Sequence, residues 1–242
     1  MKAIVTGHTK GLGEAIASDL LARDIPVLGL ARTFSDEMQA RCPGLLSQIE
    51  IDLADAGALG NWLAGSALRH YLAGDNAILL INNAGVVQPV GTLLDQDPLA
   101  VARAVTLNIA APMMLSAAVV ALSAGAERRI LHISSGAGRN AYPGWSVYCA
   151  TKAALDQHAR AVALDAVPGV RICSLAPGVI DTDMQAEIRA TPPDRFPLRE
   201  RFIELQRAGE LSTPQQTARG VVEYLLATGF GREPVDDLRT AR

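Results

Sequence analysis

Near its start the chain reads Thr6-Gly7-His8-Thr9-Lys10-Gly11-Leu12-Gly13. A short aliphatic run precedes this stretch, and a segment with helical periodicity follows it. Glycines in such a turn let the backbone approach a pyrophosphate, and the N-terminus of the helix supplies free N–H groups and partial positive charge. On these residues alone, the turn is either part of a dinucleotide-binding site or an ordinary tight connection between a strand and a helix.

Beyond this turn, short aliphatic runs alternate with longer helix-period segments, and no linker divides the chain. Continuous apolar runs such as residues 78–81 are typical of parallel strands covered by helices on both faces. The pattern predicts an α/β fold, a doubly wound parallel sheet of the Rossmann type with three layers, forming a single domain over residues 1–242. The predicted strands are 3–6, 26–31, 48–51, 77–81, 129–134 and 170–175, and the predicted helices are 11–23, 55–72, 99–122 and 148–166, with two more after residue 184.

Residues 184–214 are the one stretch without a regular pattern, because Pro192, Pro193 and Pro197 stand there among Arg and Glu residues. We expect a mobile surface insertion. In a doubly wound fold such an insertion would form a substrate loop or lid at the carboxyl edge of the sheet.

The composition excludes several classes of protein. With 242 residues, 49% apolar and 4% aromatic, the chain is long enough to bury an aliphatic core without staples and too apolar to be disordered. The net charge of −3 offers no basic surface to nucleic acid. Three widely separated cysteines, Cys42, Cys149 and Cys173, predict no disulfide and no metal site, and they favour the reducing cytoplasm.

Residues 104–126 contain no charged side chain and are long enough to span a bilayer. Polar residues such as Asn108 and Ser116 and a high alanine content make membrane insertion unfavourable, so we expect no membrane association. A helix that is apolar on all sides is buried either in a core or under a second subunit. This segment and the alanine-rich helix from Tyr148 therefore predict a homo-oligomer.

Two basic residues predict which nicotinamide cofactor binds. The acidic residue that would hold a ribose 2′-hydroxyl after the second strand is missing, and Arg32, which can accommodate a 2′-phosphate, stands in that region. Lys10, inside the turn, is placed to add a second positive charge. Either residue alone could be a solvated surface charge, but together they favour NADP(H) over NAD. His8, in the same turn, is predicted to be a surface side chain rather than a ligand.

A catalytic group is predicted from Ser135, Tyr148 and Lys152. The tyrosine and the lysine are four residues apart in a helical segment, so their side chains lie on one face. A neighbouring ammonium lowers the pKa of a phenol, and Ser135 ends the preceding strand, where its hydroxyl could hold a substrate oxygen. A Tyr-x-x-x-Lys pair alone is common by chance. The same pair is rarely found by chance in this order together with the glycine turn and with Asn82-Asn83-Ala84-Gly85.

On these residues the sequence resembles the short-chain dehydrogenase/reductase family over essentially its whole length. The Thr-Gly-x-x-x-Gly-x-Gly motif of that family matches residues 6–13, and its Asn-Asn-Ala-Gly motif matches residues 82–85. The resemblance implies that Asn108, holding a water that links the lysine to solvent, completes a tetrad with Ser135, Tyr148 and Lys152.

The resemblance also implies which residues contact the cofactor, including an adenine-contacting Asp and a threonine near the nicotinamide carboxamide. The expected set is Gly7, Thr9, Lys10, Gly11, Leu12, Gly13, Arg32, Asp52, Leu53, Asn83, Ala84, Gly85, Tyr148, Lys152, Pro177, Gly178, Ile180 and Thr182.

Residues 144–150 and 175–185 are similar to the sepiapterin reductase and benzil reductase members of the family, which are NADPH-dependent reducers of vicinal dicarbonyl compounds. This narrower resemblance implies that Asp236 anchors the substrate. The other interpretation is that Asp236 and Asp237 belong to an exposed acidic tail. The family's usual glycine-rich ending is absent, so the sequence does not predict the last strand or its subunit contacts. Ala137, Tyr142 and Trp145 are the further expected substrate residues.

Together these features predict NADPH-dependent reduction of a small-molecule carbonyl substrate by a homodimer or homotetramer. Hydride passes to the carbonyl carbon, Tyr148 gives the proton to the oxygen, and Ser135 orients and polarises that oxygen. Lys152 holds the nicotinamide ribose and lowers the pKa of Tyr148. A 3-oxoacyl-carrier-protein reductase, an NAD-dependent alcohol dehydrogenase and a non-catalytic NADP-binding sensor are the competing interpretations.

Overall fold

The computed structural model of the chain describes residues 1–241 and contains one parallel sheet in the order β3-β2-β1-β4-β5-β6-β7. The order reverses between β1 and β4, as in a doubly wound fold, so the predicted fold class is confirmed. The strands are β1 (Lys2–Thr6), β2 (Val27–Ala31), β3 (Leu46–Glu50), β4 (Ala77–Asn82), β5 (Glu127–Ile133), β6 (Val170–Ala176) and β7 (Val235–Asp237).

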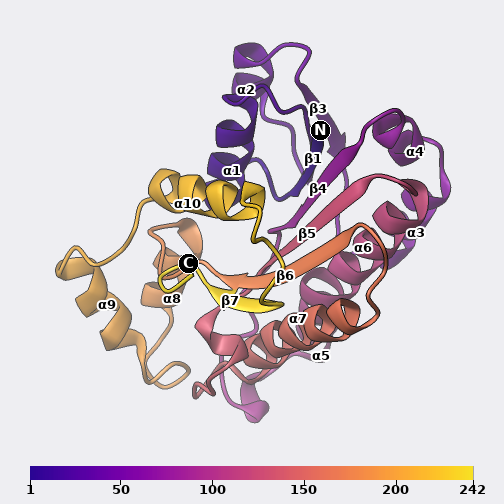
Figure 1. Cartoon of the computed structure of the whole chain (residues 1–242). Helices are drawn as coiled ribbons and strands as arrows, with labels where there is room; N and C mark the ends of the chain where they lie inside the picture. The colour runs from indigo at the N-terminus through magenta and orange to yellow at the C-terminus, as the bar shows by residue number, and fades with distance from the viewer. Residues whose placement is uncertain (242) are drawn as a thin grey trace.

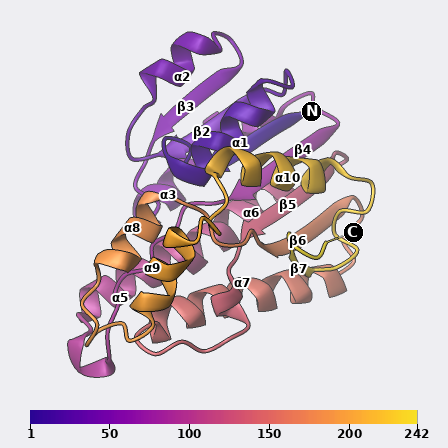
Figure 2. The same cartoon turned by 90° about the vertical axis from the view of Figure 1, so that its left-hand side faces the viewer.

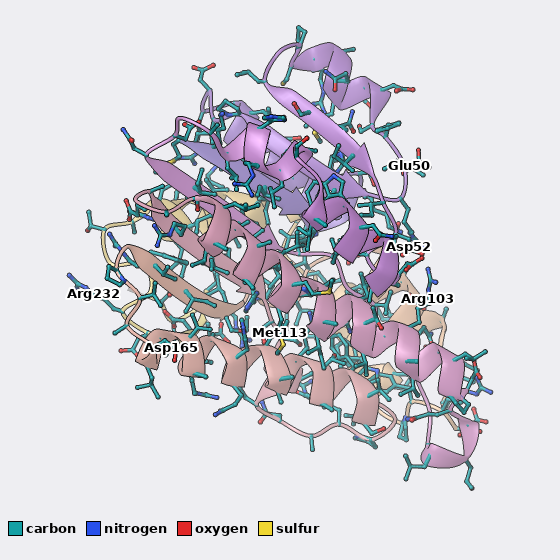
Figure 3. The ribbon with its side chains drawn as sticks, turned by 90° about the vertical axis from the view of Figure 1, so that its right-hand side faces the viewer. Glu50, Asp52, Arg103, Met113, Asp165 and Arg232 are labelled. Atoms are coloured by element: carbon teal, nitrogen blue, oxygen red, sulfur yellow. The ribbon has the colours of Figure 1, made fainter. Side chains whose placement is uncertain are left out.

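Helices cover both faces of this sheet (Figure 1). One face carries α1 (Gly11–Leu21) and α10 (Pro214–Leu226), which lie toward the viewer in Figure 2. The other carries α6 (Ala111–Leu122) and α7 (Ser146–Leu164), side by side in Figure 3. The remaining helices are α2 (Asp36–Arg41), α3 (Ala56–Ala64), α4 (Ala67–Leu72), α5 (Pro98–Val105), α8 (Asp183–Ala190) and α9 (Arg199–Arg207).

Strand β4 explains why the sheet needs helices on both sides. Leu79 and Ile81 pack into the core under α1 and α10, whereas Ile78 and Leu80 pack into the core under α4 and α6. All four side chains are fully buried. Successive side chains point to opposite faces of a strand, so an unbroken aliphatic run must be covered twice.

The segment predicted as one helix over 99–122 is a helix with one wider turn. Between α5 and α6, residues Thr106–Ala110 form a π-helical turn, in which the N–H of Ala111 donates to the carbonyl of Thr106. Pro112 has no N–H and therefore cannot donate to the carbonyl of Asn108, four residues earlier. The turn buries Asn108.

The continuous helix from Pro98 to Leu122 is apolar, with a mean hydropathy of 1.9, and only 33% of its most apolar window is buried. Its length and composition would allow it to cross a membrane, a criterion that core helices of soluble proteins also meet. The segment is therefore weak evidence for a membrane span.

The prediction of an irregular stretch at residues 184–214 is wrong. Helices α8 and α9 occupy most of it, and Pro192, Pro193 and Pro197 lie between them. Phe196 is fully buried there. Prolines mark the ends of helices as readily as they mark disorder, and only tertiary contacts distinguish the two.

Three other elements also differ from expectation. The predicted helix 55–72 is broken at Gly65 into α3 and α4, and the short helix α2 is additional. Strand β7 pairs in parallel with β6, with Val235 opposite Ser174, and lies at the edge of the sheet. Three residues are too few for a recognisable alternation, which is why β7 was not predicted.

Candidate active site

The junction of β1 and β4 forms the centre of the site. The Oγ1 of Thr6 accepts hydrogen bonds from the backbone N–H groups of Asn83 and Ala84, each at 2.9 Å. In return the side-chain amide of Asn83 donates to the carbonyl of Thr6 at 2.9 Å. These bonds hold the two strands at the point where the strand order reverses, which is where ligands bind in such sheets. Sequence reasoning did not assign this role to Thr6, although its place at the end of a strand was a signal.

The glycine turn packs directly against this junction. Gly7 and Gly11 have φ angles of 68° and 57°, in the left-handed region that favours glycine. A Cβ on Gly13 would lie 2.1 Å from the carbonyl oxygen of Gly7 and 2.3 Å from the side-chain nitrogen of Asn83. The backbone at Gly13 therefore lies closer to Gly7 and Asn83 than a residue with a side chain would allow. Helix α1 begins at Gly11, so its N-terminus lies in the turn.

His8 is fully buried, so the prediction of a surface side chain is wrong. Its ring occupies the space above Gly29 in β2, where a Cβ would lie 2.5 Å from the ring, and its Nε2 is 2.8 Å from Oε1 of Gln48. Burial lowers the pKa of His8, although its hydrogen bonds to Gln48 and to the Leu30 backbone oppose the shift. A glycine one strand away made this placement possible.

The two predicted cations lie at the surface. Lys10 pairs with Asp183, the first residue of α8, at 3.3 Å, and both side chains are largely exposed. Arg32 is exposed directly after β2. An exposed ion pair such as Lys10–Asp183 contributes little to stability, so Lys10 stays accessible to an anion. Arg32 is accessible because its side chain is exposed.

Asp52, expected near an adenine, is held by Arg103 of α5 at 2.6 Å, and the two are side by side in Figure 3. Burial acts to raise the pKa of this carboxyl. Hydrogen bonds from Ala54 and Arg103, together with the charges of Arg103 and Arg32, outweigh it and hold the pKa below its usual value. The next expected residue, Leu53, is buried in the core. Arg103 was missed because nothing in the sequence joins positions 52 and 103.

Ser135, Tyr148 and Lys152 lie together as predicted from their spacing. Ser135 follows β5, and the other two are one turn apart on α7 with only 7% and 5% of their surface exposed. The Nζ of Lys152 donates to the carbonyl oxygen of Ile133 at 2.8 Å and lies 5.6 Å from the centre of the Tyr148 ring.

Burial sets the ionisation of this group. It raises the pKa of Tyr148 to about 12, although a hydrogen bond with Ser135 acts in the opposite direction. It lowers the pKa of Lys152 to about 8, although the charge of Asp156 opposes the shift. Lys152 is not among the causes of the shift in the pKa of Tyr148, and its ammonium bonds a backbone carbonyl; that Lys152 lowers the pKa of Tyr148 stays a prediction.

Asn108 joins three elements. Its Oδ1 accepts from the N–H of Val86 at 3.0 Å, and its Nδ2 donates to the carbonyl of Val86 and to Oγ1 of Thr151. Both polar atoms of the side chain have hydrogen-bond partners. The backbone carbonyl of Asn108 receives no hydrogen bond from position 112, because proline has no N–H, so this carbonyl is the group of Asn108 that is available to bind a water. A Cβ on Gly85 would lie 3.2 Å from Oδ1 of Asn108 and 3.6 Å from Nζ of Lys152, so a side chain there would press on Asn108.

The loop after β6 faces the glycine turn. A Cβ on Gly11 would lie 3.5 Å from the methyl carbon of Thr182, which is the N-cap position of α8. Gly178 adopts φ 91° after Pro177, and Ile180 bridges to Ser212. The structure thus brings the two expected cofactor segments to one edge of the sheet.

Aromatic side chains surround Tyr148. The rings of Trp145 and Tyr148 are 5.4 Å apart, and those of Trp145 and Phe196 stack at 4.5 Å. Tyr142 and Ala137 belong to the same cluster, as do Phe196 and Phe202, which close over it from the 184–214 segment. The two phenylalanines were not predicted, although they are half of the four in the chain.

Asp236 does not join this cluster. Its Oδ2 accepts from the hydroxyl of Tyr224 on α10 at 2.9 Å, and Tyr224 packs on the opposite face of the sheet from α7. Asp237, the next residue along β7, instead binds Arg239 through both carboxylate oxygens. Alternation along the strand explains the difference, and an alignment of two adjacent aspartates could not resolve it.

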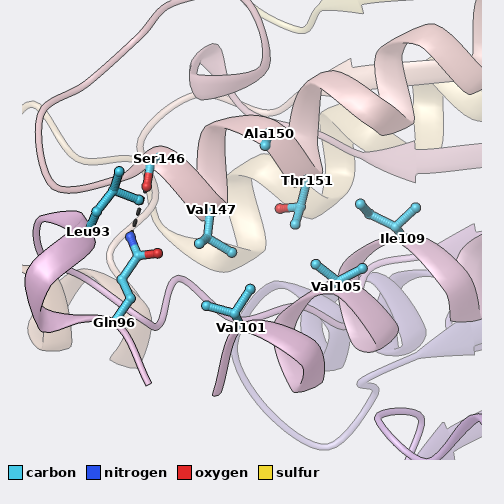
Figure 4. Close-up of a pocket in the computed structure, with 9 residues that line it drawn as sticks. All are labelled: Leu93, Gln96, Val101, Val105, Ile109, Ser146, Val147, Ala150 and Thr151. Carbon is cyan, nitrogen blue, oxygen red and sulfur yellow. Dashed lines mark hydrogen bonds between the residues drawn. The ribbon is translucent and has the colours of Figure 1, made fainter. Parts of the chain in front are cut away.

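A separate apolar groove of about 250 Å³ lies between α5 and α7 (Figure 4). Its walls include Val101, Val105 and Val147, and the side-chain amide of Gln96 donates to Ser146 across one end at 2.8 Å. None of the three catalytic candidates lines it. The groove is a surface feature of the exposed helix pair rather than the place of the chemistry.

Comparison with known proteins gives matches over most of the chain. A family model described as short chain dehydrogenase matches residues 1–193. Benzil reductase ((S)-benzoin forming) of Bacillus cereus is 35% identical, with 94% of each chain covered. Sepiapterin reductase of Meriones unguiculatus is 34% identical, covering 94% of this chain and 92% of its own. The crystal structure of a short-chain dehydrogenase/reductase from Burkholderia vietnamiensis is 49% identical with a TM-score of 0.73, covering 100% of this chain and 98% of its own.

Two glycines in helices provide a matched test of the turn. We expect Gly13→Ala to lower the free energy of unfolding by about 1–3 kcal/mol, because the new methyl group must displace Gly7 or Asn83. Gly60→Ala on α3, where the nearest atom is Met114 Cε at 3.8 Å, should raise it by about 0.5–1 kcal/mol. Urea unfolding measures both, and equal effects of the two substitutions would contradict the packing described.

Proposed function

The chain is an oxidoreductase that belongs to the short-chain dehydrogenase/reductase family, and on that premise we propose that it is an NADPH-dependent carbonyl reductase acting on vicinal dicarbonyl compounds. The observation that carries the proposal is that the buried side chains of Tyr148 and Lys152 and the half-buried Ser135 lie together, beside the glycine turn and under an aromatic cluster. A protein that only bound a nucleotide would have no chemical need for these three side chains in one place.

The residues present fit a dinucleotide. The close approach at Gly13 keeps the turn free of side chains, and α1 directs its free N–H groups into the same space. Gly7, Gly11 and Gly13 would hold the pyrophosphate, and the loop from Pro177 to Thr182 would contact the nicotinamide. When bound, the cofactor supplies the hydride.

We propose that Tyr148 is the group that donates a proton to the substrate. Because its pKa is raised to about 12, the phenol is protonated at neutral pH and can donate its proton to the carbonyl oxygen as hydride reaches the carbon. The reaction converts the C=O group to an alcohol and leaves a phenolate, which Ser135 stabilises by its hydrogen bond. Lys152 and the Asn108 carbonyl then lead a proton back from solvent.

Arg32 supports NADP(H) as the cofactor. It is exposed at the end of β2, where an acidic residue would repel a 2′-phosphate, and Lys10 is exposed on the turn. A guanidinium suits a phosphate because it donates in pairs. Asp52 is already bound by Arg103, so its negative charge near this site is partly compensated.

The aromatic cluster supports the substrate class. Tyr142, Trp145 and Phe202 pack in one cluster with Tyr148, and their flat apolar rings suit a diketone with an aryl or pterin ring. The names of two relatives, benzil reductase and sepiapterin reductase, agree with such substrates. Segment 184–214 would open as a lid, since Phe196 and Phe202 cover the tyrosine.

We further propose that two copies associate through α5 and α7, within a single-domain chain in the cytoplasm. Leu93, which lines the groove of Figure 4, and Leu99, on α5, are 82% and 79% exposed, and only 33% of the most apolar window of the long helix is buried. The three free cysteines agree with a reducing compartment.

Replacing the proposed acid tests the reaction. Tyr148→Phe should lower kcat/KM for NADPH-linked reduction of benzil or sepiapterin by about 10²–10⁴-fold, because the proton donor is lost. NADPH binding, followed by nucleotide fluorescence, should be retained. Near-full activity of the variant, or no activity of the wild type on diketones, pterins, quinones or acyl thioesters, would refute the assignment.

The cofactor assignment is tested separately. Arg32→Ala should lower kcat/KM for NADPH by about 10–100-fold, the value of one to two charged hydrogen bonds, and leave that for NADH nearly unchanged. Arg41→Ala, which removes an exposed arginine paired only with Glu37, serves as the control. An unchanged NADPH to NADH ratio in Arg32→Ala would exclude this role.

The oligomer is tested by light scattering at micromolar concentration. The wild type should have at least twice the mass of one chain, and Val105→Arg should shift it toward the monomer, since the new charge would be buried in the groove. Phe34→Arg, at an exposed apolar site between β2 and α2, should not. A monomeric wild type would contradict the interface.

A further inference from the structure

Helix α7 carries a third buried polar side chain on the face of Tyr148 and Lys152. Asp156 follows Lys152 by one turn and is only 1% exposed. Its Oδ1 accepts from the hydroxyls of Ser134 and Ser174, each at 2.7 Å, and its Oδ2 accepts from Nε of Arg139 at 3.2 Å. These three donors give the buried side chain of Asp156 hydrogen-bond partners on both carboxylate oxygens.

The surrounding backbone keeps this carboxylate in place. A Cβ on Gly138 would lie 3.0 Å from both Oδ2 of Asp156 and the carbonyl oxygen of Lys152, so the short turn after Ser135 rests directly on α7. Arg139, next in the chain, donates through Nη2 to the carbonyls of Ser174 and Asp236. Asp156 therefore has one orientation available, toward the strand ends.

Lys152 has no carboxylate of its own. The ion pairs found among residues 1–241 do not include it, and its ammonium donates to the neutral carbonyl of Ile133. Asp156 is the negative charge that acts on it, from one helical turn away. A buried ammonium without such a charge would lose its proton easily.

The other titratable groups around Lys152 are neutral or act through Arg139. On β5, burial lowers the pKa of His132 to about 3, with the charges of His158 and Lys152 adding to the shift. On β6, burial raises the pKa of Cys173 to about 11. On β7, Asp237 lies 4.0 Å from Arg139. Tyr148 and Cys149 on α7 both have raised pKa values, chiefly from burial, so they are uncharged at neutral pH.

We propose that Asp156 is a positioning residue that keeps Lys152 protonated during turnover. In the same proposal, the positive charge of Arg139 weakens the electrostatic effect of the Asp156 carboxylate on the Lys152 ammonium. The proposal rests on the reductase function proposed above. It assigns a role in the reaction to the Arg139–Asp156 ion pair, in which the Asp156 side chain is buried and the Arg139 side chain is 27% exposed.

The two partners act with opposite sign. Burial lowers the pKa of Lys152 to about 8, so its proton is lost just above neutrality, and activity that needs the ammonium falls along an alkaline limb. Asp156→Asn removes the negative charge and should move this limb to lower pH. Arg139→Gln removes the positive charge and should move it to higher pH. A purely structural disturbance has no reason to reverse sign between two residues that contact each other.

The experiment is a pH profile of kcat/KM for the carbonyl substrate at saturating NADPH. We expect shifts of about one unit in each direction, the lower range for a neighbouring charge. Asp165→Asn, the same substitution at an exposed site near the end of α7, is the matched control and should leave the limb in place. Asp156→Glu should restore the wild-type limb.

A second readout does not depend on activity. The chain has only three lysines, Lys2, Lys10 and Lys152, so NMR of protein labelled with ¹³C at the lysine ε-carbon gives three signals that can be titrated individually. The Lys152 signal should titrate lower in Asp156→Asn and higher in Arg139→Gln. If Asp156→Asn fails to fold, the upward shift of the Lys152 titration in Arg139→Gln tests the proposal by itself.

Shifts in the same direction for both variants, or no shift of the Lys152 signal, would overturn the proposal even if the enzyme is active. Absence of NADPH-linked reduction in the wild type would instead refute the proposed function, and the NMR titration would still report on the lysine. The two failures are therefore distinguishable.

Discussion

The hydroxyl of Thr6 holds the carboxyl ends of β1 and β4 together, and the rest of the site is built outward from that junction. Two backbone N–H groups converge on one oxygen, and the amide of Asn83 returns a bond to the same residue. The carbonyl of Gly7 and the side-chain amide of Asn83 then lie so close to Gly13 that this position cannot carry a side chain. The N-terminus of α1 consequently opens at the point where the strand order reverses, where a parallel sheet leaves a crevice for a ligand.

The second constraint is the burial of a polar helix face. Tyr148, Lys152 and Asp156 follow one another at four-residue intervals along α7, and all three are more than nine-tenths buried. Removing such groups from water favours their neutral forms, which raises the pKa of the phenol and lowers that of the ammonium. The protein compensates with the Ile133 carbonyl for the lysine and with two serine hydroxyls and Arg139 for the aspartate. Ionisation here is set by the balance of burial against a few precise contacts.

Much of the architecture was accessible from local pattern. An aliphatic run at 78–81 requires cover on both faces, and the four-residue spacing of Tyr148 and Lys152 requires a shared helix face; both features are present. Predictions failed where a local signal had two meanings. The prolines of 184–214 separate two helices instead of marking an irregular loop, and His8 is buried because Gly29, on another strand, leaves room for its ring. Asp236 and Asp237 are adjacent, and only the side of β7 that each one faces distinguishes them.

The sequence by itself determined the parallel sheet, the glycine turn and the order of the catalytic candidates, because these depend on spacing along one strand or one helix. Tertiary structure decided which groups are charged and which contacts hold them. Arg103 bonds Asp52 across 51 positions, and Asp156 accepts from Ser174 in β6, from Ser134 just after β5 and from Arg139 in the turn that follows. Burial and long-range pairing are properties of the assembled core, and no local pattern encodes how far a side chain lies from water. The direction of each pKa shift in the site therefore became readable only once the chain was folded.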